Sequence, residues 1–299
     1  MSTTKIVLSV IGVVGLGVAV YLFAPPSVPD LPLPTGPEAI AKGEYLFNAG
    51  GCGACHQPEG TTAPIGGYEI KTEKPFLNIF RAPNITPDAT GIAGWTGKDF
   101  IRALKHGRKP NGGFYWPAFP FRSYKGMTDE DVLLIGAYLM SLPPVSNKVP
   151  GHTLPVWQTS LMMAGWNKMA DFMEGTPPKI ESDDPLIQRG AYLARVLGHC
   201  GECHTPRNQL GIMLLSKEFE GSEIVHKSID ANTIAAWSSL EFTSFLELGM
   251  TKANDFVGGE MEDVIKHTKL LSKEDKEAYA AFFTRVSGGK GDGTVDSFD

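Results

Sequence analysis

Residues 187–208, IQRGAYLARVLGHCGECHTPRN, decide how the rest of the chain is interpreted. They end in the motif Cys200-Gly-Glu-Cys-His204, and a second copy stands at Cys52-Gly-Ala-Cys-His56. Two thiols three positions apart in a turn can each attach to one vinyl group of a haem, and the adjacent imidazole then points at the iron. The two motifs therefore predict two covalently bound haem c groups. The predicted attachment residues are Cys52, Cys55, Cys200 and Cys203, and the predicted metal ligands are His56 and His204.

Two other kinds of site use the same residue types. A thioredoxin-type redox pair does not need the histidine and follows a strand, whereas both motifs follow helical patterns. A zinc site could be built from all four thiolates, or from two thiolates and two imidazoles. The chain has four cysteines and both motifs together use all of them, which favours haem.

The flanks of the motifs repeat as well, which indicates a duplication. Ile40-Ala-Lys-Gly-Glu-Tyr-Leu46 recurs as Ile187-Gln-Arg-Gly-Ala-Tyr-Leu193, at an offset of 147 positions. Further on, a group of four residues recurs at an offset of 142. Trp95, Phe100, Leu104 and Gly107 return as Trp237, Phe242, Leu246 and Gly249. Each half is predicted to run helix, haem motif, long loop, helix, ligand loop, helix, so the chain is all-α with two small haem domains.

The last helix of each half carries a capping signal. Thr128 precedes the apolar run VLLIGAYLMSL, and Ser272 precedes KEAYAAFFTRV. A Ser or Thr with an acidic residue three positions later is typical of a helix start. Pro143 and Gly288 are predicted to end these helices.

The composition of the 299-residue chain excludes some classes of function. With 42% hydrophobic and 20% charged residues it can bury a core. Its net charge of −6 offers no basic excess to neutralise phosphates, so nucleic acid is not an expected partner.

Residues 6–24 form 19 consecutive positions without a charge. They would span roughly 28 Å as a helix, which is close to one bilayer core. A cleaved secretion signal is the alternative, but the run is long for a signal core and Pro25-Pro26 follows Ala24; a cut after Ala19 stays open. We expect an uncleaved single-pass anchor. Lys5 before the run favours a cytoplasmic amino terminus, with the remainder in the bacterial periplasm.

The next segment, residues 25–37, contains six prolines. Such a run favours an extended, semi-rigid chain of roughly 40 Å. It is predicted to hold the soluble part away from the lipid surface.

A methionine is the expected sixth ligand of each iron, because methionine or histidine closes the distal side of electron-carrying haems. Met127, in the loop before the last helix of the first half, is the first choice there, since Met140 lies within the helix pattern. In the second half Met261 is placed in a ligand loop before the last helix. Met213 lies close to His204 and Met250 directly follows a helix. Met127 and Met261 do not align relative to their final helices.

Other side chains near the motifs have two interpretations. Trp95 and Trp237 occupy repeated places, and an indole N–H there contacts a haem propionate or packs at the helix start. His199 is too near Cys200 to be the distal ligand of the same haem. The rival histidine ligands are His106, His152, His226 and His267.

The methionine-rich stretch 161–173 is predicted to be an amphipathic connector between domains, or a docking surface for a partner.

Three groups of residues resemble the membrane-associated dihaem cytochromes c, which are similar to the cytochrome subunits of bacterial alcohol, sugar and aldehyde dehydrogenases. The resemblance covers residues 36–286. The residues that carry it are Asn84-Ile-Thr-Pro-Asp88 with Gly91-Ile-Ala-Gly-Trp95, Pro117-Ala-Phe-Pro120 with Met127-Thr-Asp-Glu-Asp-Val132, and Gly190-Ala-Tyr-Leu193 with Gly198–Asn208. The resemblance implies class I cytochrome c domains, periplasmic electron transfer, and ligands at Met127 and Met261. The alcohol dehydrogenase subunits usually carry three haem motifs, whereas this chain has two.

These observations predict a membrane-tethered relay that takes electrons from a periplasmic dehydrogenase or quinol and passes them to a downstream cytochrome or oxidase. It is not expected to be an enzyme. The alternative is a haem enzyme with one open iron, of peroxidase or sulfur-oxidising type. The predicted organisation is anchor or signal 1–24, linker 25–37, cytochrome domain 38–148, connector 149–182, cytochrome domain 183–286 and flexible tail 287–299.

Overall fold

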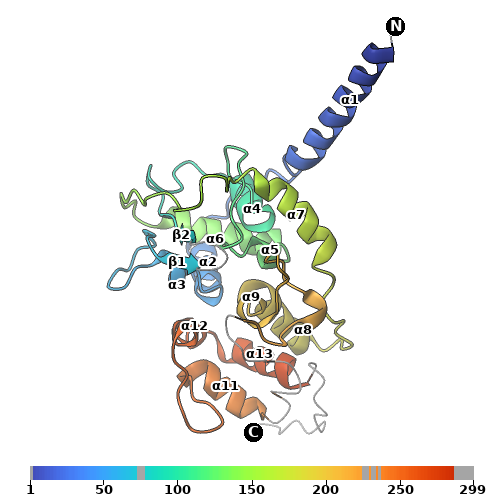
Figure 1. Ribbon diagram of the computed structural model, residues 1–299. Coiled ribbons are helices and arrows are strands. Elements are labelled where there is room, and N and C mark those ends of the chain that lie inside the picture. The colour runs from blue at the N-terminus through green and yellow to red at the C-terminus, as the bar shows by residue number, and fades with distance from the viewer. Residues whose placement is uncertain (1–2, 73–77, 224–228, 230–233, 235–236, 286–299) are drawn as a thin grey trace.

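In the computed structural model a single helix projects from a mainly helical body (Figure 1). The structure describes residues 3–72, 78–223, 229, 234 and 237–285. His226, Gly288 and the tail 287–299 lie outside the described residues. The first elements in chain order are α1 (Thr3–Phe23), α2 (Pro37–Ala49), α3 (Cys52–His56), β1 (Glu69–Thr72), β2 (Asn78–Arg81), α4 (Gly97–His106), α5 (Phe121–Tyr124), α6 (Asp129–Ser141) and α7 (Met162–Met173). The later ones are α8 (Pro185–Tyr192), a π-helical turn (Leu193–Leu197), α9 (Gly201–His204), a 3-10 turn (Leu215–Lys217), α11 (Ser239–Leu248), α12 (Glu260–Thr268) and α13 (Lys273–Arg285).

Each half is built around one pair of crossing helices. α2 packs against α6 in the first half, and α8 packs against α13 in the second. A glycine stands at each crossing, because a Cβ on Gly43 would overlap the carbonyl oxygen of Leu134, and one on Gly190 would overlap that of Ala278. The repeated glycines therefore let the two helix backbones touch.

Alanine at either crossing is expected to destabilise the protein. Because the obstacle is backbone rather than a flexible side chain, the helices must separate, at a cost of about 2–3 kcal/mol per substitution. Chemical denaturation of Gly43→Ala and Gly190→Ala measures this loss. Gly165→Ala is the matched control, since Gly165 lies within α7 with nothing near its Cβ position. If Gly190→Ala unfolds at the same denaturant concentration as Gly165→Ala, this description of the crossing is wrong.

Side-chain caps start the same helices in both halves. Thr96 and Ser238, which were not among the predicted caps, form capping boxes at the starts of α4 and α11, and left-handed Gly107 and Gly249 end these helices. The two predicted caps are present. Thr128 caps α6, and the hydroxyl of Ser272 accepts the amide N–H of Asp275 at 3.1 Å at the start of α13. Local capping chemistry thus fixes the same boundaries in both halves.

Two local features depart from the all-α prediction. The long loop after the first motif contains a short antiparallel hairpin in which Ile70 pairs with Phe80. The helix before the second motif is not continuous, because it changes from α8 to a π-helical turn at Leu193.

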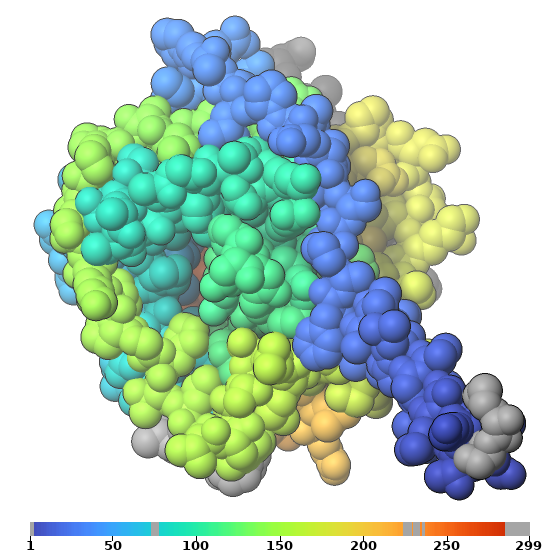
Figure 2. Space-filling view, turned by 90° about the horizontal axis from the view of Figure 1, so that it is seen from above, coloured from blue at the N-terminus to red at the C-terminus, as the bar shows by residue number. Residues whose placement is uncertain are grey.

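The proline-rich segment does not act as a spacer. It runs from α1 along the surface of the body (Figure 2). Leu33 packs against the core, where its side chain lies beside Gly136 of α6. The end of α1 is held as well, since the Arg108 guanidinium donates to the carbonyl oxygen of Phe23 at 2.7 Å. The expectation of an arm that holds the body away from the lipid is therefore wrong, because Val28 and Leu33 pack partly buried against the core and the carbonyl oxygen of Leu31 lies beside Gly97 of α4.

Two tyrosines join the halves reciprocally. The Tyr45 hydroxyl of α2 donates to the Asp275 carboxylate at the start of α13 at 2.6 Å. The Tyr192 hydroxyl of α8 donates to the Asp131 carboxylate at the start of α6 at 2.5 Å. Tyr45 and Tyr192 are repeat partners, so the same contact is made in both directions. The two hydrogen bonds are therefore equivalent contacts between the repeated segments.

Candidate functional site

Each cysteine motif folds as one helical turn. The first forms α3, and the second forms α9 with Cys200 as its N-cap residue. Residues three apart in a helix lie on one face, so both thiols of a motif sit on the same side of the turn. A left-handed residue precedes each turn, Gly51 at φ 61° and His199 at φ 40°.

The first histidine is held in the orientation that a metal ligand needs. The Nδ1 atom of His56 lies 2.8 Å from the carbonyl oxygen of Pro83. A carbonyl only accepts, so Nδ1 carries the proton and Nε2 keeps its lone pair for a metal. Burial lowers the pKa of His56, which favours the neutral imidazole. His204 is also buried, at 7% exposure. Pro83 was not among the predicted residues.

The thiols do not have the character of a redox pair. All four cysteines are free, and burial raises the pKa of both Cys52 and Cys200 to about 12. Reactive dithiols instead have a lowered pKa. Among the described residues there is no group of three or more His, Cys, Asp or Glu placed to hold a metal ion. Two adjacent thiols and an oriented imidazole are, in contrast, the set that covalent haem attachment requires, so the residues fit that group.

The two predicted methionine ligands lie in different settings. Met127 is 2% exposed, belongs to the hydrophobic core and directly precedes the cap of α6. Met261 lies in the first turn of α12 and is partly exposed. The prediction that Met261 lies in a loop is therefore wrong, because a short helix forms between α11 and α13.

The other methionines are engaged elsewhere. Met140 packs against the core from α6. Met213 pairs with Arg207 through the backbone, and Met250 pairs with Phe256 directly after the C-cap of α11. The structure therefore gives no reason to prefer them over Met261 as a ligand in the second half.

Trp95 and Trp237 each stand just before a helix cap. Trp95 packs edge-on against Phe100 at 5.2 Å between ring centres, and Trp237 packs against Phe245 at 5.6 Å. These contacts account for them as packed aromatic residues at a helix start. A propionate contact for either indole stays a prediction.

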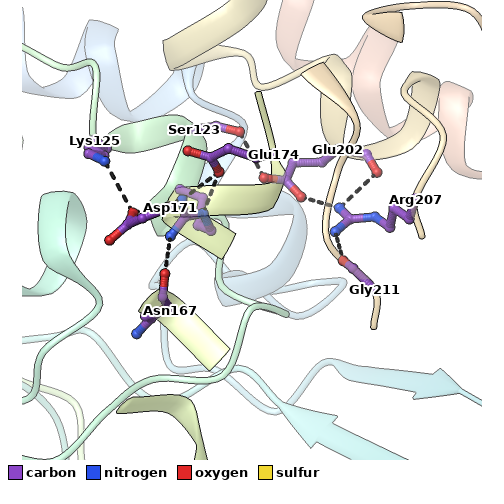
Figure 3. Close-up of polar contacts among 9 residues, drawn as sticks. Ser123, Lys125, Asn167, Asp171, Glu174, Glu202, Arg207 and Gly211 are labelled. Atoms are coloured by element: carbon purple, nitrogen blue, oxygen red, sulfur yellow. Dashed lines mark hydrogen bonds and ion pairs between the residues drawn. The ribbon is translucent and has the colours of Figure 1, made fainter. Parts of the chain in front are cut away.

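The short helix α5 contacts both motifs. The Tyr124 hydroxyl lies beside the Cys52 thiol and donates to the carbonyl oxygen of Gly50 at 3.3 Å. The Ser123 hydroxyl donates to the carboxylate of Glu202 within the second motif at 2.7 Å (Figure 3). The Tyr124 ring also meets His199 edge-on at 5.5 Å. The two motifs are therefore linked through two consecutive residues of one helix.

Charged side chains fix α5 in this place. The Arg122 guanidinium donates to Glu174 at 2.7 Å and to Asp171 of α7 at 3.0 Å. On the other side of Glu202, Arg207 forms an ion pair with the same carboxylate (Figure 3). The segments that lead into the two motifs also meet, since the side chain of Leu197 lies beside Gly50. Sequence patterns gave no signal for these contacts, which join residues far apart in the chain.

Comparison with known proteins gives a consistent result. The family model described as cytochrome c matches residues 40–143. A diheme cytochrome c-type protein of Cereibacter sphaeroides is 36% identical over 275 residues, which cover 85% of this chain and 90% of that protein. The gluconate 2-dehydrogenase cytochrome c subunit of Pantoea cypripedii is 31% identical, covering 87% of this chain and 62% of the relative. The fructose dehydrogenase cytochrome subunit of Gluconobacter japonicus is 34% identical, covering 83% and 52%.

Proposed function

Because this chain belongs to the cytochrome c family, we propose that it is a membrane-tethered dihaem cytochrome that relays electrons from a periplasmic dehydrogenase to a respiratory acceptor. It is an electron-transfer protein rather than a catalytic subunit. Two of its relatives are named as cytochrome subunits of gluconate and fructose dehydrogenases, which supports a dehydrogenase as the donor. A quinol is the second candidate donor.

The residues proposed to hold the haems follow from the two motifs. Cys52 and Cys55 attach the first haem and Cys200 and Cys203 the second, with His56 and His204 as proximal ligands. When bound, each haem supplies an iron that cycles between ferrous and ferric states. The protein holds the imidazoles, as Pro83 does for His56, and excludes water around them. Met261 is proposed as the distal ligand of the second haem.

One observation carries the relay proposal: Ser123 and Tyr124 contact the second and first motifs respectively. Because consecutive residues of α5 touch both motifs, two haems attached there would lie side by side within one chain. A chain that only presented two independent carriers would not need this contact. Tandem class I cytochrome c domains account for the repeated helix crossings and the reciprocal tyrosine contacts.

The anchor is proposed from α1, which has a mean hydropathy of 2.6 and contains no buried residue. Such a helix spans a bilayer or serves as a signal. With the amino terminus in the cytoplasm, the motifs would lie in the periplasm. The mature membrane-bound protein should then have its full-length mass, whereas loss of residues 1–19 or 1–24 would show cleavage.

Purification of the full chain from membranes tests the relay. The purified protein is expected to contain two haems per chain, and mass spectrometry should identify a dehydrogenase that copurifies with it. Adding the substrate of that dehydrogenase should reduce both haems, at a rate that falls with salt because the relay has a net charge of −6. A colourless polypeptide would exclude the proposed function, and haems reduced only by quinol would exclude the dehydrogenase as donor.

A further inference from the structure

Comparison of the two halves shows which residue of the first half corresponds to Met261, the proposed distal ligand in the second half. α4 and α11 end at Gly107 and Gly249, an offset of 142 positions. The turns that follow are the same at this offset: Arg108 pairs with Phe114, as Met250 pairs with Phe256. The backbone N–H groups of Tyr115 and Val257 donate to the carbonyl oxygens of Gly107 and Gly249 at 2.8 and 2.9 Å.

At the same offset the position of Met261 corresponds to Phe119. Each lies twelve residues after its glycine C-cap; Phe119 directly precedes Pro120, the N-cap of α5, and Met261 is the second residue of α12. Phe119 offers no atom that can ligate iron.

Met127 corresponds instead to Leu271. Met127 directly precedes Thr128, the cap of α6, and Leu271 directly precedes Ser272, the cap of α13. Both side chains are buried, at 2% and 6% exposure, and both belong to the hydrophobic core. Because a leucine occupies this position in the second half, a side chain here needs only to pack beneath the start of the last helix. This also explains why Met127 and Met261 lie at different distances from their final helices.

Phe119 belongs to an aromatic group that contacts the first motif. Its ring centre lies 5.4 Å from that of Tyr115 and 5.8 Å from that of Tyr124, both edge-on. Tyr124 in turn lies beside Cys52 and bonds to Gly50. Phe119 is therefore one ring away from the proposed attachment site.

Two of the described histidines are engaged away from the first motif. His152 accepts the N–H of Arg81 at 3.1 Å beside strand β2. His106 lines a cavity of about 230 Å³ near α1. The other two reach the first half from the second: the His199 ring meets Tyr124 of α5 edge-on, and His267 lies against Gly53 of the attachment turn itself.

We infer that Met127 is a packing residue, that Phe119 stands where the second half has Met261, and that the first haem therefore has no methionine ligand and can bind a neutral diatomic gas. The inference rests on the proposed haem attachment. Carbon monoxide is the suitable probe, because it binds ferrous haem only where an axial position is open or weakly held.

Spectroscopy of the full-length protein in detergent tests the inference without measuring turnover. The reduced wild type is expected to bind one carbon monoxide per two haems. Met127→Leu should leave both this ratio and the ferric methionine–iron absorption band unchanged, since Leu271 shows that leucine fits the position. Phe119→Met should add a second methionine–iron contribution and abolish carbon monoxide binding.

Two results would overturn the inference. The first is a reduced wild type that binds no carbon monoxide. The second is a Met127→Leu variant that loses half of the methionine–iron band, which would establish Met127 as a ligand. Either result leaves the two-haem relay intact, whereas a chain with fewer than two haems would contradict the relay itself.

Discussion

Replacing both cysteines of one motif, as in Cys52→Ser with Cys55→Ser, is expected to remove one haem from the chain and leave the other attached. Serine hydroxyls do not form thioether bonds, so His56 alone would have to hold the group. The partly buried turn of α3 would keep its helical geometry because serine is similar in size to cysteine. Intact mass should fall by one haem, and the haem content should halve.

The matched variant at the second motif, Cys200→Ser with Cys203→Ser, should lose the other haem. If the chain is a two-site relay, each double variant loses transfer between donor and acceptor completely, although one iron still reduces and oxidises. The measurement is haem reduction by the donor combined with oxidation by membranes. Full transfer activity in either double variant would show that only one motif lies on the electron path.

Loss of the Met261 sulfur should produce the second largest effect. Methionine opposite histidine raises the haem potential, and axial ligands tune potentials over a range of roughly 0.8 V. Met261→Ala is therefore expected to lower the potential of one haem markedly and to remove the ferric methionine–iron band. Because Met261 is partly exposed in the first turn of α12, the fold should tolerate the change.

Redox titration followed by optical spectroscopy measures this effect. Met250→Leu is the control, since Met250 is the rival sulfur and its backbone pairing with Phe256 does not depend on its side chain. If Met250→Leu lowers the potential while Met261→Ala does not, the ligand assignment is reversed. Carbon monoxide uptake by Met261→Ala should also rise from one to two per chain.

The sequence alone was sufficient for features that are encoded over a few residues. The haem motifs, the caps at Thr128 and Ser272 and the apolar run of α1 depend on neighbours within one or two helical turns. Such local chemistry is the same wherever the segment is placed. The repeat also predicted paired elements correctly, because equal spacing of Trp95, Phe100 and Gly107 reproduced α4 as α11.

Local sequence patterns did not predict the hairpin β1–β2 or the π-helical turn at Leu193. The hairpin closes through cross-strand pairing such as Ile70 with Phe80, for which the sequence carries no distinctive turn signal. The composition of the proline-rich segment predicts a spacer, whereas Leu33 packs against α6. Composition predicts how a segment behaves when it is free in solution. It carries no information about the surface of the folded protein on which the apolar side chains of that segment can pack.

What the sequence by itself determined is the chemistry of each half: two Cys-His turns, each followed by a capped last helix, and a chain belonging to the c-type cytochromes. Only the tertiary structure decided how the halves meet. Tyr45 reaches Asp275 across 230 positions, and Ser123 and Tyr124 of α5 contact both motifs. Contacts of this kind depend on the packing of whole helices, so they have no signature in neighbouring residues.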